Sequence, residues 1–146
     1  MFSVLPVSPN DTLLVTPLGQ MTPPDHVFPA PHLYIYVLDP RSPVDKEALV
    51  YAPGDMVLTS VGLRHYNTLG SETNYIDYTL VFYVCNDFVL YFHHLRSLRY
   101  QPFVDAASQI LKTCSFSTQR NEDFCSGDVF VKVRAGEVIG TTGDLK

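Results

Sequence analysis

The stretch "YIDYTLVFYVCNDFVLYFHHL", Tyr75–Leu95, decides the fold, because it holds two long runs of strand-forming residues separated by a short polar break. Aromatic and β-branched residues dominate both runs. Asn86 and Asp87, which lie between them, favour a two-residue hairpin turn. We therefore predict two antiparallel strands, Tyr75–Cys85 and Phe88–His94, as the centre of a β domain.

Shorter apolar runs bounded by turn formers lie on both sides of this pair. With eleven prolines and eight glycines in the chain, they indicate further strands joined by turns. Helical spacing of apolar residues occurs only at Val104–Leu111. The further predicted strands are Thr12–Leu18, Leu33–Asp39, two within Leu49–Gly62 around a Pro-Gly-Asp turn, and two within Asp128–Asp144 around a turn at Arg134–Glu137.

The 146 residues are long enough for one domain with a sizeable core. We expect a single domain over residues 1–146, in which a Pro-rich segment, 1–31, packs on the rest. The predicted fold class is mainly β, an antiparallel sandwich or open barrel with at most one short helix.

Composition excludes several classes of partner. The net charge is -5 and no basic cluster occurs, so neither nucleic acid nor an anionic membrane surface is expected as a partner. No apolar run approaches the roughly 18–20 residues of a membrane span. The start "MFSVLPVSPND" lacks the regions of a signal peptide, but export stays open, because a Met1 placed before a trimmed secreted protein would look the same.

The three cysteines fall into two groups. Cys85, inside a predicted strand, is expected to pack as a small hydrophobic residue. Cys114 and Cys125 flank a polar loop, which they would close as a disulfide in an oxidising compartment; two free thiols are the alternative. Their spacing is not that of a Cys-x-x-Cys metal or redox site.

The histidine doublet at the end of the second long strand is the first candidate for chemistry. Strand alternation places His94 on the face of Phe92 and His93 on the opposite face with Tyr91 and Leu95. Both faces are largely apolar, which predicts a strand packed on both sides. A buried imidazole needs a hydrogen-bond partner. The structural alternative is therefore a core histidine bonded to a backbone carbonyl, with its neighbour at the rim.

Three segments in sequence order resemble the lysostaphin-type zinc endopeptidases and their duplicated-hybrid-motif relatives: "VYAPGDMVLTSV", "YFHHLRSL" and "VKVRAGEVIGTTGD". Those proteins carry a Val-x-Ala-Pro-x-x-Gly-x-Val hairpin, an aromatic-x-His-Leu strand end and a Val-x-x-Gly-x-x-Ile-Gly-x-x-Gly segment. Met56 departs from the hairpin glycine. The matching positions are Val50, Ala52, Pro53, Phe92, His94, Leu95, Val133, Gly136, Ile139, Gly140 and Gly143.

This resemblance implies a barrel of the duplicated-hybrid-motif type, with its core over residues 49–144. It also implies hydrolysis at a zinc ion, which keeps an open position for water and lowers the pKa of that water to about 7. His94 matches the catalytic histidine that assists the metal. His93 would take this role if the strand register were shifted by one residue.

The zinc ligands of the family are missing. Its first pair is a His followed four residues later by Asp, but Tyr36 follows His32 and Ala30 follows His26 at that spacing. Its second motif, His-x-His near the C-terminus, does not occur before Lys146. The resemblance therefore implies a degenerate, non-catalytic domain in the cell envelope or in a secreted protein.

Such a domain would bind a peptide, peptidoglycan or another envelope protein in the former active-site groove. Tyr34, Tyr36, Tyr91 and His93 are the expected contact residues, since their rings combine apolar area with polar tips. Ordinary packing on the sheet is the alternative role for these tyrosines.

A second hypothesis keeps an active zinc metallopeptidase. "PLGQMTPPDHVFPAPH" resembles the opening of bacterial relatives of these peptidases, in which two histidines also lie six residues apart. It predicts that His26 and His32 lie beside His94, where three imidazoles would bind zinc. The alternatives are a solvated His26 and a His32 ring packed on Tyr34. His65 is expected at the surface of a polar loop.

Sugar-phosphotransferase carriers of the glucose type provide a third hypothesis, since they share the Ala-Pro-x-x-Gly hairpin and use a histidine pair. Their His-Ile-Gly after the strand is absent here, where Leu95 and Arg96 follow His94.

Overall fold

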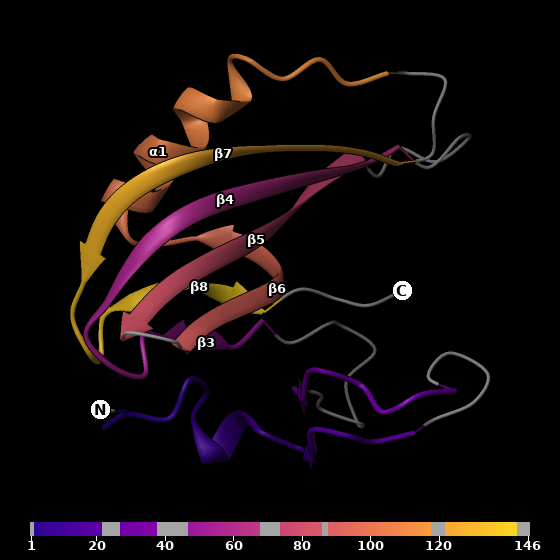
Figure 1. The fold of residues 1–146 in the computed structure, drawn as a ribbon, viewed down its shortest axis with the longest axis vertical. Helices are drawn as coiled ribbons and strands as arrows, with labels where there is room; N and C mark the ends of the chain where they lie inside the picture. The colour runs from indigo at the N-terminus through magenta and orange to yellow at the C-terminus, as the bar shows by residue number, and fades with distance from the viewer. Residues whose placement is uncertain are drawn as a thin grey trace.

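A computed structural model describes residues 2–21, 27–37, 47–67, 74–85, 88–117 and 122–142. Over these residues the fold is mainly β with antiparallel sheets and one α-helix, as predicted (Figure 1). The order along the chain is a 3₁₀ turn at Pro9–Asp11, β1 (Leu14–Thr16), β2 (Tyr34–Tyr36), β3 (Leu49–Tyr51), β4 (Met56–Asn67), β5 (Asn74–Cys85), β6 (Phe88–Leu98), α1 (Gln101–Leu111), β7 (Glu122–Val133) and β8 (Val138–Thr142).

Six of the strands form one antiparallel sheet in the order β3-β8-β6-β5-β4-β7. The long strands β4, β5 and β7 curve strongly, so that β8 and β3 lie beneath them (Figure 1). The central pair predicted from the sequence is confirmed, since β5 pairs with β6 in antiparallel register. Asn86 and Asp87, the predicted turn, lie outside the described residues.

Several strands are longer than predicted. β4 continues to Asn67 and β6 to Leu98. The polar residues at these strand ends, such as Arg64 and Arg96, therefore belong to the sheet rather than to loops. Polarity predicted a loop from Arg64 onward, but cross-strand pairing holds both strand ends extended: β4 pairs with β5 as far as Asn67, and the end of β6 pairs with β8 at Ser97 and Leu98. The type of β-fold predicted by the lysostaphin resemblance stays a prediction.

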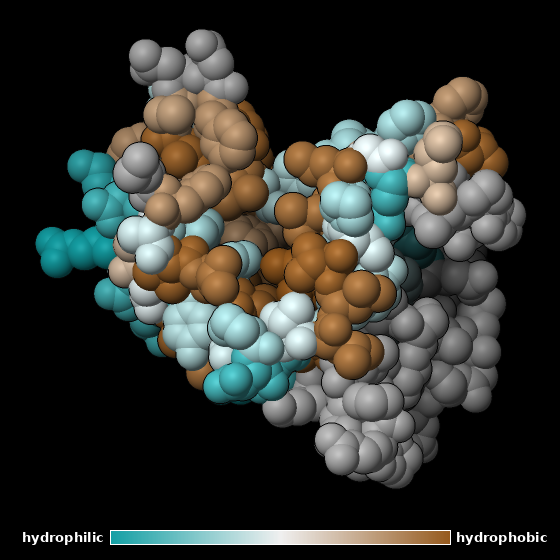
Figure 2. Space-filling model, turned by 90° about the horizontal axis from the view of Figure 1, so that it is seen from below, coloured by the Kyte–Doolittle hydropathy of each residue, from teal (hydrophilic) through white to brown (hydrophobic). Residues whose placement is uncertain are grey.

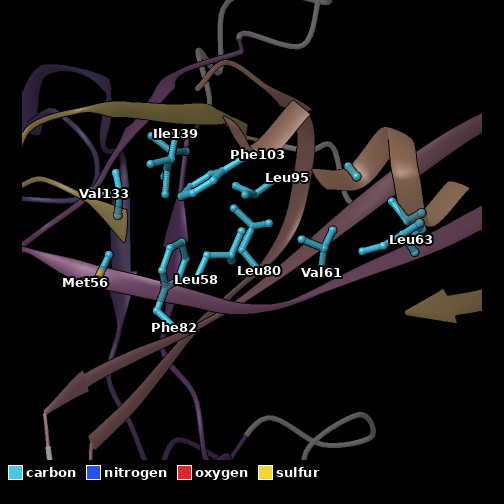
Figure 3. Packing of buried hydrophobic residues seen from close by; sticks show 14 of the residues in the cluster. Met56, Leu58, Val61, Leu63, Leu80, Phe82, Leu95, Phe103, Val133 and Ile139 are labelled. Carbon is cyan, nitrogen blue, oxygen red and sulfur yellow. The ribbon is translucent and has the colours of Figure 1, made fainter. Parts of the chain in front are cut away.

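The face of the sheet that packs against α1, here called the inner face, forms the core. Apolar side chains from all six strands of this sheet and from Phe103 on α1 form one cluster there, and the labelled ones point toward one another (Figure 3). Phe82 and Phe103 are fully buried, with ring centroids 5.7 Å apart. Such close packing makes this face the main source of stability. The labelled members are Met56, Leu58, Val61, Leu63, Leu80, Phe82, Leu95, Phe103, Val133 and Ile139.

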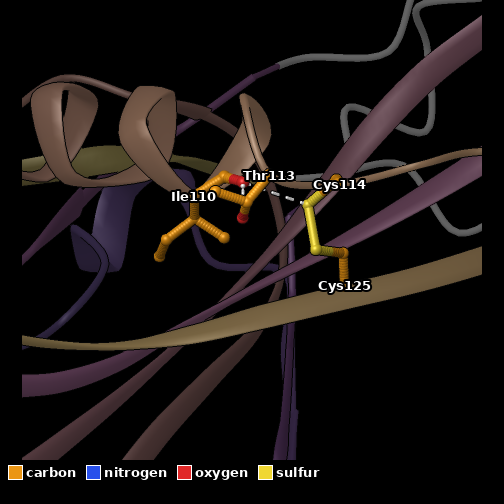
Figure 4. Close-up of a disulfide and its surroundings, with 4 residues drawn as sticks. All are labelled: Ile110, Thr113, Cys114 and Cys125. Carbon is orange, nitrogen blue, oxygen red and sulfur yellow. Dashed lines mark hydrogen bonds between the residues drawn. A yellow bond between two sulfur atoms is a disulfide. The ribbon is translucent and has the colours of Figure 1, made fainter.

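The helix α1 begins one turn before the predicted Val104, with Pro102 in its first turn, where the missing N–H costs nothing. Ile110 packs over Gly127 of β7 so closely that a Cβ at Gly127 would meet it at 2.8 Å. A disulfide joins Cys114, just after the helix, to Cys125 on β7 (Figure 4). The helix end is therefore tied covalently to the sheet, as one of the two sequence hypotheses predicted.

The N-terminal segment packs on the side of the domain away from α1 (Figure 1). Backbone N–H groups of Ser3 and Val4 donate to the carbonyl of Pro53, and Val7 is buried in the core. Further along, β1 and β2 form a separate two-stranded sheet. Within the described residues, no helix has the length and apolar character needed to cross a membrane.

Two sequence predictions about single residues are wrong. Cys85 is an exposed free cysteine at the end of β5, so it does not pack as a core residue. His65 does not lie on a surface loop: it is half-buried in β4, and its ring stacks on Phe116 at 4.9 Å. The segment after α1, which the disulfide holds against the sheet, supplies that partner.

Candidate functional site

A β-bulge on β6 organises the candidate site. Leu80 of β5 pairs with Phe92, but Tyr78, two residues away, pairs with Leu95. Thr79 is therefore opposed by two residues, His93 and His94. The second of these has φ of 61°, in the left-handed region that few residues other than glycine adopt.

The bulge overturns the predicted placement of the histidine doublet. Simple alternation put His93 and His94 on opposite faces, but the extra residue resets the alternation. Leu95 is buried on the inner face, 3 % exposed. Both imidazoles contact β5 side chains on the opposite, outer face: Asp77 and Thr79. β6 is thus packed on one face only along much of its length, since Val89 and Tyr91 remain exposed.

Asp77 fixes the imidazole of His94. Its Oδ2 lies 2.7 Å from His94 Nδ1, and its side chain is only 10 % exposed, against 37 % for His94. A carboxylate accepts a hydrogen bond from Nδ1–H, which leaves Nε2 as the acceptor of the neutral ring. The second carboxylate oxygen of Asp77, Oδ1, is buried without a hydrogen-bond partner among the described residues.

His93 has a different environment from His94. Its Nδ1 lies 2.9 Å from Thr79 Oγ1, and its ring lies 4.7 Å from that of Tyr91. Partial burial lowers the pKa of His93, the neighbouring His94 lowers it further, and Asp77 opposes the shift. The ring centroids of His93 and His94 lie 6.1 Å apart.

A fixed positive charge lies beside this pair on β4. Arg64 bonds Glu122 of β7 at 3.0 Å. A hydrogen bond with Tyr66 raises the pKa of Arg64, and the carboxylates of Glu122 and Asp77 add to the effect. The outer face therefore carries positive and negative side chains on three neighbouring strands: Asp77 on β5, Arg64 on β4 and Glu122 on β7.

The N-terminal segment adds rings to the same place. Tyr91 Oη donates to the carbonyl of Pro31 at 3.3 Å, which sets the following His32 beside β6. The charge of His32 contributes to lowering the pKa of His93. The His32 ring also packs edge-on against Tyr34 at 4.8 Å, the alternative noted from the sequence. Tyr34 in turn lies 5.9 Å from Tyr36.

The predicted zinc site is only partly covered by the structure. His26, one of its three proposed ligands, lies outside the described residues. Within the described ranges, no three side chains of His, Cys, Asp or Glu are arranged to hold a metal ion. His94 keeps only Nε2 for a metal, because Asp77 occupies Nδ1. The His26/His32/His94 site therefore stays a prediction.

Asp77, Thr79 and Arg64 were missed by the sequence reasoning. A signal for Asp77 was present, since it is a carboxylate inside the apolar run "YIDYTLVFYVC". A charged residue in a half-buried strand requires a partner. Its partner could not be found from alternation, because the bulge on β6 changes which side chain faces it.

A concave region lies between α1 and β6. Its volume of about 190 Å³ is below the roughly 300–1,000 Å³ of ordinary ligand sites. Its lining is largely apolar and includes Leu63, Leu98, Val104 and Ala107. It is therefore better explained as a gap in core packing than as a ligand site.

Comparisons of the chain with protein families, with curated proteins and with solved structures found no match. The lysostaphin-type resemblance therefore stays a prediction from sequence motifs. The outer-face site itself holds an oriented imidazole, a second imidazole of lowered pKa and several aromatic rings.

Proposed function

We propose that this chain is a peptide-binding domain of the cell envelope or of a secreted protein, a degenerate relative of the lysostaphin-type peptidases that captures its ligand without cleaving it. One observation carries the proposal. The rings of His32, Tyr34, Tyr91 and His93 gather beside an imidazole that the buried Asp77 holds in one orientation.

The orientation of His94 supports recognition of a hydrogen-bond donor. Its Nε2 accepts when the ring is neutral, and an extended peptide presents an amide N–H at regular intervals. The left-handed backbone at His94 supports a functional role, because residues held in this region cost about 1–3 kcal/mol and cluster at binding and active sites.

The surroundings of the site support a ligand with apolar side chains. Tyrosine rings provide contact area at low conformational-entropy cost. On the side of the molecule where the N-terminal segment lies, brown hydrophobic residues surround a hollow (Figure 2). The large apolar side chains of that segment are unusually exposed, among them Leu14, Leu18, Met21, Val27 and Phe28.

A binding experiment with peptidoglycan and its parts tests the proposal. The protein is sedimented with intact peptidoglycan and titrated with stem-type peptides and with peptide-free glycan strands. We expect intact peptidoglycan and peptides to bind and glycan alone not to bind. Equal binding of peptide-free glycan would replace the peptide by a glycan ligand, and no binding in any arm would contradict the proposal.

Variants locate the binding surface. His94→Asn retains a residue type that tolerates left-handed backbone and should weaken peptide binding at least about tenfold, as loss of a central polar contact does. The matched control is Tyr83→Ala, which removes a 42 % exposed tyrosine farther along the outer face and should leave affinity within about twofold. Loss of affinity in Tyr83→Ala but not in His94→Asn would place the ligand elsewhere.

The carboxylate on His94 Nδ1 also favours a second candidate, a zinc metallopeptidase, because metal-bound histidines usually donate their other ring nitrogen to such a group. His26, His32 and His94 would hold the ion, which would supply an activated water. Stoichiometric zinc and peptide hydrolysis, both lost in His32→Ala, would favour this candidate. Protein purified without chelator and free of metal would exclude it.

A further inference from the structure

We propose that β7 is the interface of a symmetric homodimer, in which two copies of the chain pair their β7 strands antiparallel about Gly127. The proposal does not depend on the ligand site, because β7 and the histidine doublet lie on different strands. It rests on the open edge of the sheet, on the direction of its backbone groups and on the order of its side chains.

β7 is a long edge strand. It runs for twelve residues at the end of the six-stranded sheet, and within the described residues it pairs with β4 alone. A long edge presents unpaired N–H and C=O groups to another chain, and proteins usually shorten, cover or break such edges. β7 contains no proline.

Two hydrogen bonds show which backbone groups point outward. The carbonyl of Gly127 accepts from Ser60 Oγ on β4, so it faces into the sheet. The carbonyl of Lys132 accepts from Tyr100 Oη at 3.5 Å, outside the strand pair. The two bonds lie on either side of the register shift that the β4–β7 pair makes between Asp128 and Val131, so each fixes the direction of its own part of β7. Because backbone direction alternates within each part, Ser126 and Asp128 face the open edge on one side of the shift and Lys132 on the other.

The even-numbered residues of β7 also carry the exposed side chains. Phe124 is 59 % exposed and Phe130 is 75 % exposed, while the odd-numbered residues pack toward α1. The Phe124 ring lies over Gly62 of β4, but most of its surface stays exposed, so that with Phe130 it gives this edge strand two exposed aromatic side chains on the outer face.

The order of side chains is self-complementary about Gly127. In that antiparallel register Glu122 faces Lys132 of the second copy, Phe124 faces Phe130, and Ser126 faces Asp128, and symmetry repeats each pair. Opposite charges and aromatic pairs are the favourable cross-strand combinations. Among the described residues Lys132 makes no ion pair, while Glu122 already bonds Arg64, so the second copy would complete a cluster of three charges.

Neighbouring registers lose these pairs. A shift by two residues in one direction sets Glu122 against Phe130 and Ser126 against itself. A shift in the other direction sets Asp128 against itself, which places like charges opposite each other. The charge order therefore selects a second copy of this chain, in one register, over an unrelated strand.

Sedimentation equilibrium of the full chain tests for the dimer. Lys132→Glu should raise the dissociation constant at least about tenfold, since it turns two attractive pairs into repulsive ones. Lys112→Glu, the same charge change at an exposed site after α1, should change it less than about twofold. A wild-type chain that stays monomeric up to on the order of 100 µM would overturn the proposal.

Cysteine cross-linking tests the register in a Cys85→Ser background, which removes the free thiol. Facing residues of a hydrogen-bonded antiparallel pair lie about 5.5 Å apart at Cα, within disulfide range. A mixture of Ser126→Cys and Asp128→Cys proteins should form a mixed disulfide dimer under mild oxidation, while neither protein should cross-link alone. A dimer of Ser126→Cys alone or of Asp128→Cys alone would show one of the shifted registers and overturn the proposed one.

Discussion

The inner and outer faces of the six-stranded sheet are made by the same strands but differ in almost every physical respect. The inner face is closed by α1 and by the fully buried Phe82 and Phe103. The outer face holds a buried carboxylate, a strained histidine and exposed aromatic residues such as Phe130. The comparison indicates that stability comes from the inner face, while the outer face is available for ligands and partners.

The largest expected effect is the difference in stability loss between a phenylalanine substitution on the inner face and one on the outer face. Phe103→Ala should lower the free energy of unfolding by about 3–5 kcal/mol, because it removes a fully buried ring and leaves a cavity. Phe130→Ala, at 75 % exposure, should cost less than about 0.5 kcal/mol in the monomer. Denaturant unfolding at low protein concentration measures both, and equal losses would break the distinction between the faces.

A smaller effect measures the strain stored on the outer face. His94→Ala and His94→Gly both lose the hydrogen bond to Asp77. Only the alanine variant retains the conformational free-energy cost of the left-handed backbone at φ 61°. His94→Ala should therefore be about 1 kcal/mol less stable than His94→Gly. The same unfolding assay compares the two variants. If alanine were the more stable, the bulge would relax on substitution and the strain at His94 would not be intrinsic to the site.

The smallest effect is the dependence of stability on pH. The pKa of His93 is lowered in the folded chain from its ordinary 6.5, so just below pH 6.5 the unfolded chain binds more protons. Stability should fall as the pH falls through this range, and the change should be weak because the ring retains solvent exposure. His93→Gln should flatten this part of the stability profile between about pH 5 and pH 8. An unchanged profile would show that His93 does not contribute.

Local patterns predicted much of the inner face. Runs of β-branched and aromatic residues located β4, β5, β6 and β8, and apolar spacing located the helix α1. The strand ends were set too short, because Arg64 and Arg96 are polar, yet cross-strand pairs keep them extended. One of two cysteine hypotheses, the Cys114–Cys125 disulfide, is present in the structure.

The candidate site was predicted only in part. The resemblance pointed to His94 as the catalytic position, and that role stays a prediction; Tyr91, His93 and His32 lie near one another in the structure. The faces assigned to the doublet were wrong, and the carboxylate of Asp77 was missed.

The amino-acid sequence by itself determined the elements: mainly antiparallel strands, one helix and a histidine doublet near the end of a central strand. These follow from side-chain preferences and from periodicity within a few residues. Only the tertiary structure decided where the doublet faces, because one extra residue at His94 reverses the alternation for everything that follows. The bulge is accommodated by contacts with β5, of His93 with Thr79 fourteen positions away and of His94 with Asp77 seventeen positions away. Such pairing is a property of two strands rather than of one.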